Sequence, residues 1–133
     1  MRRTLALLCL VALVACRSGG GSVEELCDAV RSDRSTAAVF SGFDPSDTER
    51  ALEQLRQARL TLGELRDAAP DEVRDDIDVE IAYVQALVDE LAALTDPEPA
   101  QSVEIFRQVT ADHPGVAAAA TNLAAFSQEN CAG

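Results

Sequence analysis

The sequence predicts an all-α fold: a small antiparallel helical bundle of four to five helices, with its termini joined by a disulfide. Apolar residues recur at helical spacing along the chain, and no stretch alternates as a strand does. Short stretches with proline, glycine and acidic residues separate these segments, and such stretches are typical of the connections between helices. Two cysteines, Cys27 and Cys131, stand near the two ends of the folded part. Amphipathic helices joined by short connections are expected to pack as an antiparallel bundle.

The first fifteen residues have the pattern of a secretory signal peptide. Arg2 and Arg3 precede an uncharged, leucine-rich run from Thr4 to Ala15. A helix needs about 20 apolar residues to cross a bilayer, so this run is too short for a permanent anchor. We therefore expect residues 1–15 to be cleaved from the mature chain.

The end of this run resembles the lipobox of bacterial lipoproteins, with Leu13, Val14 and Ala15 preceding Cys16. The resemblance implies a diacylglyceryl group on the sulfur of Cys16, cleavage before it, and anchoring at the extracytoplasmic face of the cell membrane. Two or more acyl chains hold a protein at a membrane firmly, whereas one binds only marginally. The alternative is an ordinary secreted protein cut near Ala15, with Cys16 left as a free thiol.

The mature chain then divides into two parts. Residues 16–22 contain the lipidated cysteine and the segment RSGGGS, a flexible tether with a span of about 13 Å for six residues. Residues 23–133 form the helical domain. About 118 residues remain after cleavage, which is enough for one domain with one modest core.

The chain is strongly acidic, and all eleven of its basic residues are arginines. Cleavage of residues 1–15 removes two arginines and no acidic residue, so the formal net charge changes from −12 to about −14. Nucleic acid and anionic lipid headgroups would both be repelled. We expect no nucleic-acid partner, and membrane association through the lipid on Cys16 alone.

The remaining cysteines predict one disulfide. Cys9 leaves with the signal peptide and Cys16 carries lipid, so Cys27 and Cys131 form an even pair in an oxidising compartment. Closing a loop of about 100 residues stabilises a fold by up to about 4.7 kcal/mol in the chain-entropy model. Two unpaired buried thiols are the alternative. The chain has no C-x-x-C spacing and a single histidine, so neither a redox nor a metal role is expected.

Capping signals give the expected helix boundaries. The second helix starts either at Asp44, as N-cap before Pro45, or at a capping box of Ser46 and Glu49. Asp96 before Pro97 is a further N-cap signal. The expected helices are residues 22–40, 44 or 46 to 68, 71–94, 96–112 and 116–130.

Each expected helix has one apolar stripe that we predict to face the core. The stripes are Val23, Leu26, Cys27 and Val30; Ala51, Leu55, Ala58, Leu62, Leu65 and Ala69; Val73, Ile77, Ile81, Val84, Val88 and Leu91; Val103, Phe106 and Val109; and Ala120, Leu123 and Phe126.

The segment ELRDAAPDEVRDDIDVEIAYV, together with a last helix that ends in a cysteine close to glycine, resembles a loosely defined group of small, alanine-rich, secreted or lipid-anchored actinobacterial proteins. The group has no assigned activity, so the resemblance implies no site residues. Ala132 between Cys131 and Gly133 is a minor departure from its pattern.

The densest group of ionisable side chains is the acidic run that begins at Asp71. Asp71, Asp75 and Asp78 share a helix face, and a calcium site is the alternative interpretation of these carboxylates, but a straight helix cannot wrap an ion with carbonyl oxygens. We interpret the cluster as a solvated helix start that complements the helix dipole. His113 is expected to cap a helix end or to be exposed, since no second histidine accompanies it.

Two further segments have alternative interpretations. Phe40 and Phe43 flank Gly42 and are expected in the core, the alternative being an exposed partner-binding spot. The segment GVAAAATNLAAF offers small residues for close helix packing, the alternative being the lining of a narrow apolar cavity.

These observations together predict a lipid-anchored, extracytoplasmic helical protein without enzyme activity or cofactor. Its expected role is to bind another envelope protein as an accessory component. The alternative is a carrier of an apolar small molecule between helices, which requires a cavity larger than a packed bundle leaves. An enzyme would need a cleft that gathers Asp75, Asp76 and Tyr83.

Overall fold

The computed structural model describes residues 20–31 and 43–131. Within these ranges the regular elements are helices: α1 (Val23–Arg31), α3 (Thr48–Ala68), α4 (Asp71–Ala92), α5 (Pro99–Asp112) and α6 (Val116–Cys131). The predicted all-α fold is confirmed. The described ranges do not include residues 1–15, Cys16 or the expected helical residues 32–40, among them Phe40. The fold therefore does not test the predictions made for these residues.

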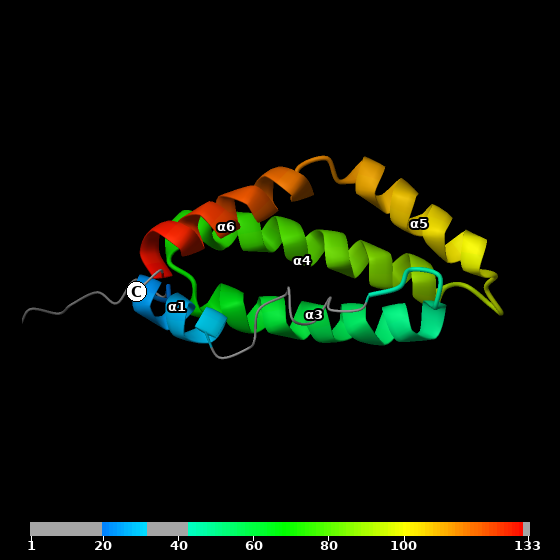
Figure 1. Ribbon diagram of the computed structural model, residues 1–133, viewed down its shortest axis with the longest axis horizontal. Helices are drawn as coiled ribbons and strands as arrows, with labels where there is room; N and C mark the ends of the chain where they lie inside the picture. Colours follow the sequence, from blue (N-terminus) through cyan, green and yellow to red (C-terminus); the bar gives the residue numbers. More distant parts are fainter. Residues whose placement is uncertain (1–19, 32–42, 132–133) are drawn as a thin grey trace, which may run out of the picture.

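Helix α4 is the central element of the bundle. It pairs with α3 as a long antiparallel hairpin, and α5 and α6 then run back along it one after the other (Figure 1). The short helix α1 lies at the end of the bundle where α3 and α6 finish (Figure 1). The molecule therefore has two ends of different construction, one closed by α1 and α6 and the other by α5 and the start of α3.

The predicted apolar stripes of the α3–α4 hairpin form the core. All six predicted positions of α3 and its C-cap are buried: Ala51, Leu55, Ala58, Leu62, Leu65 and Ala69. On α4 the buried positions are Val73, Ile77, Val84, Leu87 and Leu91, with Ile81 and Val88 packed against them. Full burial of a leucine or isoleucine side chain contributes about 1.5–3 kcal/mol, so this seam supplies most of the stability.

The start of α3 differs from both predicted alternatives. Asp47 is the N-cap and accepts a hydrogen bond from the Arg50 backbone N–H at 3.1 Å. Asp44 is instead used in a turn before the helix, where its carboxylate accepts from the backbone N–H and the hydroxyl of Ser46. The predictions of an Asp44 cap and a Ser46 capping box are therefore wrong, because the turn engages both residues and delays the helix to Thr48.

The start of α5 also differs from prediction. Glu98 is the N-cap and forms a capping box with Gln101, and Pro99 occupies the first turn. Asp96, the predicted cap, has a φ of 48° and lies in the left-handed region. Asp96 therefore turns the chain between α4 and α5, and the helix begins two residues after Pro97.

The core faces of α5 and α6 are rotated relative to the predicted stripes. Ser102 is fully buried and Val103 is 45% exposed, because the Ser102 hydroxyl bonds the Thr48 hydroxyl and this contact turns Ser102 toward α3. On α6, Ala119 is buried and Ala120 is exposed. The prediction that Val103 faces the core is wrong, whereas Ala120 is on the inner side of α6 but is not buried. The remaining predicted positions hold: Val109 is buried, and Phe106, Leu123 and Phe126 pack against the core.

The segment before α1 packs against the bundle. Ser22 and Glu25 form a reciprocal pair of hydrogen bonds that caps α1. Gly21 passes so close to the end of α3 that a Cβ at this position would lie 2.0 Å from the Ala68 carbonyl oxygen. Glycine is therefore required at position 21, and the last residues of the predicted tether belong structurally to the domain.

The predicted disulfide is present between Cys27 of α1 and Cys131 of α6, with their Cα atoms 5.2 Å apart. It joins positions separated by 104 residues in the sequence. The Arg31 guanidinium donates a further hydrogen bond to the Cys131 carbonyl oxygen at 3.2 Å. A nine-residue helix is marginal alone, so α1 depends on this bond and on the burial of Leu26 for its position.

Candidate functional site

A groove of about 340 Å³ lies between α1, α3, α4 and α6, at the disulfide end of the bundle. We call it the interhelical groove. Its lining residues are Leu26 and Val30 from α1, Leu62 and Leu65 from α3, Ile77 and Glu80 from α4, and Ala120, Leu123, Ala124 and Ser127 from α6. The volume falls at the lower end of the range of about 300–1,000 Å³ found for small-molecule sites.

The local sequence explains why the core is incomplete here. Helix α6 presents Ala120 and Ala124 to the groove, and alanine side chains do not reach across to α1 and α3. The Cys27–Cys131 bond joins α1 and α6 at the same end. Within the alanine-rich segment, Ala119 is buried, while Ala120 and Ala124 are exposed and line the groove.

Glu80 is the titratable side chain among the groove's lining residues, and it is half-buried. Burial raises the pKa of the Glu80 carboxyl above its ordinary value, and the neighbouring Asp76 raises it further. Within residues 20–31 and 43–131, no side chain or backbone group donates a hydrogen bond to this carboxyl. The groove thus combines apolar walls with one half-buried carboxyl that has no hydrogen bond to another described residue.

Asp76 itself faces α6, where its carboxylate accepts a hydrogen bond from the Asn122 amide at 3.2 Å. The groove faces of α1, α3 and α6 contribute no charged residue to its lining. The negative potential in the groove therefore comes from Glu80 and, one helical turn away, from Asp76.

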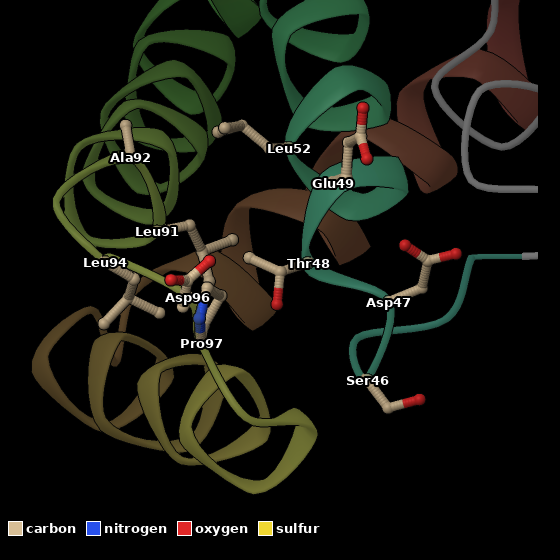
Figure 2. A pocket seen from close by; sticks show the side chains of 10 residues that line it. All are labelled: Ser46, Asp47, Thr48, Glu49, Leu52, Leu91, Ala92, Leu94, Asp96 and Pro97. Carbon is tan, nitrogen blue, oxygen red and sulfur yellow. The ribbon is translucent and has the colours of Figure 1, made fainter.

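A second hollow, of about 560 Å³, lies at the opposite end of the bundle between the start of α3 and the loop that follows α4. Leu52, Leu91 and Leu94 form its apolar part, and Asp47, Glu49 and Asp96 are its acidic residues. Figure 2 shows the carboxylates of Asp47 and Asp96 on either side of Thr48, pointing in different directions. Asp47 is already engaged as the cap of α3, so these acids do not form one binding centre.

The acidic start of α4 is a set of ion pairs and hydrogen bonds. Asp71 contacts Arg74 at 2.9 Å, and Asp78 forms a bidentate pair with Arg66 of α3. The Arg66 hydrogen bond holds the pKa of Asp78 below its ordinary value. In the described part of the chain no three His, Cys, Asp or Glu side chains converge in a group able to hold a metal ion.

His113 and Tyr83 have structural partners. His113 is the C-cap of α5, where its Nδ1 lies 2.9 Å from the Val109 carbonyl oxygen and its ring packs edge-on against Tyr83. The Tyr83 and Thr110 hydroxyls are hydrogen-bonded at 2.9 Å. Asp75, Asp76 and Tyr83 do not line either of these two hollows.

Phe43 packs edge-on against Phe106 with ring centroids 5.2 Å apart, so the predicted packing of Phe43 against the core is confirmed. Glu80 is the site residue that sequence reasoning missed. A signal was present, because Glu80 follows Ile77 by three residues and precedes Val84 by four, which places it on the buried side of α4.

Comparisons with models of protein families, with curated proteins and with solved structures found no match to this chain. None of the helices in the described ranges is both long enough and apolar enough to cross a bilayer.

Proposed function

We propose that this chain is a non-catalytic binding protein of the cell envelope, held at the extracytoplasmic face of the membrane by lipid on Cys16. The ligand site that the geometry supports best is the interhelical groove, and the ligand class is a small apolar molecule. The observation that carries this proposal is the partly open, mainly apolar groove of about 340 Å³ lined by four helices. Such a volume meets the requirement for a carrier that a fully packed bundle would not meet.

Binding at this site would follow from ordinary desolvation. The groove walls are aliphatic side chains of Leu26, Leu62 and Leu123, among others, so an apolar ligand removes their remaining surface from water. Each Å² of apolar surface removed from water contributes about 25 cal/mol. The disulfide and the α3–α4 core hold the walls in place before a ligand arrives, so little conformational entropy is lost on binding.

Native mass spectrometry of the protein extracted from its own envelope tests the proposal. The expected spectrum has a chain that starts at Cys16, carries acyl chains, lacks the two hydrogens of the Cys27–Cys131 bond, and retains a small non-covalent ligand. Ala124→Leu places a larger side chain in the groove and should remove the ligand mass. Ala125→Leu, on an exposed position of α6 outside the groove, is the matched control and should retain it.

Two results would contradict parts of this proposal. A chain without acyl groups would overturn the lipid anchor, and its Cys16→Ser variant would then fractionate like the parent protein. A spectrum in which the parent protein and the Ala125→Leu variant both lack a small ligand would overturn the carrier proposal.

Docking of an envelope protein is the second candidate function. The observation that favours it is Leu60, a large apolar side chain that is 59% exposed on α3. A protein partner that depends on this face should be lost from the native complex in Leu60→Arg and retained in Ala124→Leu. The opposite pattern would assign the partner to the groove.

A further inference from the structure

The interhelical groove has one carboxyl, that of Glu80, among its apolar walls. What this carboxyl selects rests on the proposed small-molecule site. Glu80 shares the groove lining with aliphatic side chains, and no hydrogen bond joins its half-buried carboxyl to another described residue. A ligand that displaces water from this carboxyl must supply a donor in return or leave the carboxyl unpaired. Leaving a desolvated polar group unpaired is costly, so donors are selected.

The sign of the preferred donor follows from the surrounding charge. Asp76, on the same helix, adds negative potential to that of Glu80, and the groove faces of α1, α3 and α6 contribute no charge. The mature chain's formal charge of about −14 favours the approach of cations over that of anions. A protonated amine would donate a hydrogen bond to the ionised carboxylate and also form an ion pair with it, whereas a neutral donor would supply the hydrogen bond alone.

We propose that the interhelical groove binds small apolar molecules carrying one protonated amine, with the apolar body against Leu62, Leu65 and Leu123 and the ammonium on the Glu80 carboxylate. The Ser127 hydroxyl lines the same groove and can accept a second hydrogen bond from the ammonium. The volume of about 340 Å³ corresponds to roughly ten water-sized units, since one water occupies about 30 Å³ of liquid. The preferred ligand therefore has on the order of ten heavy atoms.

The test uses benzylamine and benzyl alcohol, two water-soluble probes with the same ring, the same number of heavy atoms and different head groups. Each is titrated calorimetrically at pH 7 into the full chain held in lipid nanodiscs, with lipid-only nanodiscs as the blank. Benzylamine is expected to bind about tenfold more tightly than benzyl alcohol, because both head groups can donate a hydrogen bond to the carboxylate but only the ammonium adds an ion pair. Ala124→Leu should weaken both probes, which places them in the groove.

Glu80→Gln is the decisive variant, and Glu90→Gln is its control. Both remove one negative charge from α4, but Glu90 is exposed and lies outside the groove lining. Glu80→Gln should remove the tenfold preference for the amine while leaving benzyl alcohol binding within about twofold of the parent. Glu90→Gln should leave the binding of both probes within about twofold, since the distant charge is largely screened.

The outcomes separate the two proposals. Equal binding of both probes, unchanged in Glu80→Gln, would overturn the charge preference and leave the apolar site standing. Binding of neither probe to the full chain would overturn both proposals. Loss of amine binding in Glu80→Gln with retained alcohol binding would support the proposal, provided the variant keeps the parent's helical circular dichroism.

Discussion

At one end of the bundle α1 and α6 are joined by the Cys27–Cys131 disulfide, whereas at the other end α3 and α5 meet through the Thr48 and Ser102 hydroxyls. The hollow at the disulfide end is mainly apolar and is lined by four helices. The hollow at the opposite end has Asp47, Glu49 and Asp96 in its lining, and Phe43 packs against Phe106 beside the core there. The two ends therefore differ in the chemistry of their hollows and in the bonds that join their helices.

Loss of the disulfide should destabilise one end of the bundle only. The Cys27→Ser/Cys131→Ser double variant is expected to lower the free energy of unfolding by about 2–4 kcal/mol, because the bond closes a loop of 104 positions. Chemical denaturation measures the loss. Native-state hydrogen exchange should show α1 losing protection first, while the amides of α5 keep theirs. Equal loss of protection in both helices would show that the two ends unfold as one unit.

Matched leucine truncations should show whether the two ends differ in packing. Leu55→Ala removes a side chain with 0% exposure in the closed part of the core and should cost about 3–5 kcal/mol. Leu65→Ala, at a groove-lining position that is 8% exposed, should cost about 2 kcal/mol, since the new space merges with an existing one. Equilibrium denaturation of both variants tests the difference. Equal losses would mean that the groove is as tightly packed as the rest of the core.

The hydroxyl contact at the far end should have a smaller effect. Ser102→Ala removes the partner of the Thr48 hydroxyl in a buried position and should lower the free energy of unfolding by about 0.5–1.5 kcal/mol. Ser127→Ala, at a groove-lining serine without a partner among the described side chains, is the control and should be close to neutral. A neutral effect at both serines would show that the contact does not hold α5 to α3.

The Asp78–Arg66 pair should have the smallest effect, and that effect should depend on pH. The pKa of Asp78 is lowered in the folded chain, first by the hydrogen bond from Arg66, so the pair stabilises the fold above the ordinary carboxyl value of 3.8. This contribution is lost as the pH falls through the lowered value. Asp78→Asn should therefore be slightly less stable than the parent at pH 7 and equally stable in strong acid. Thermal unfolding across pH 2–7 measures this, and a difference independent of pH would contradict the assignment.

Much of the fold could be predicted from local patterns. The heptad stripe of α3 gave its buried positions correctly, because neighbouring residues in one helix fix which side is apolar. The predicted helix starts were less accurate than the predicted core positions. Asp44 and Asp96 have side chains suited to N-caps, but both residues lie in turns before the helices begin. Several short polar residues in a row offer alternative local hydrogen bonds, and the sequence pattern does not rank them.

The sequence by itself determined the helical class, the seam between α3 and α4, and the pairing of Cys27 with Cys131, because these depend on periodicity and on a count of cysteines. Only the tertiary structure decided that Ser102 faces inward, that Ala120 and Ala124 face a groove, and that Glu80 lies inside it. Those features depend on which side chains from distant segments stand opposite one another. Burial, unpaired hydrogen-bonding capacity and cavity volume are properties of several helices together, so no single segment encodes them.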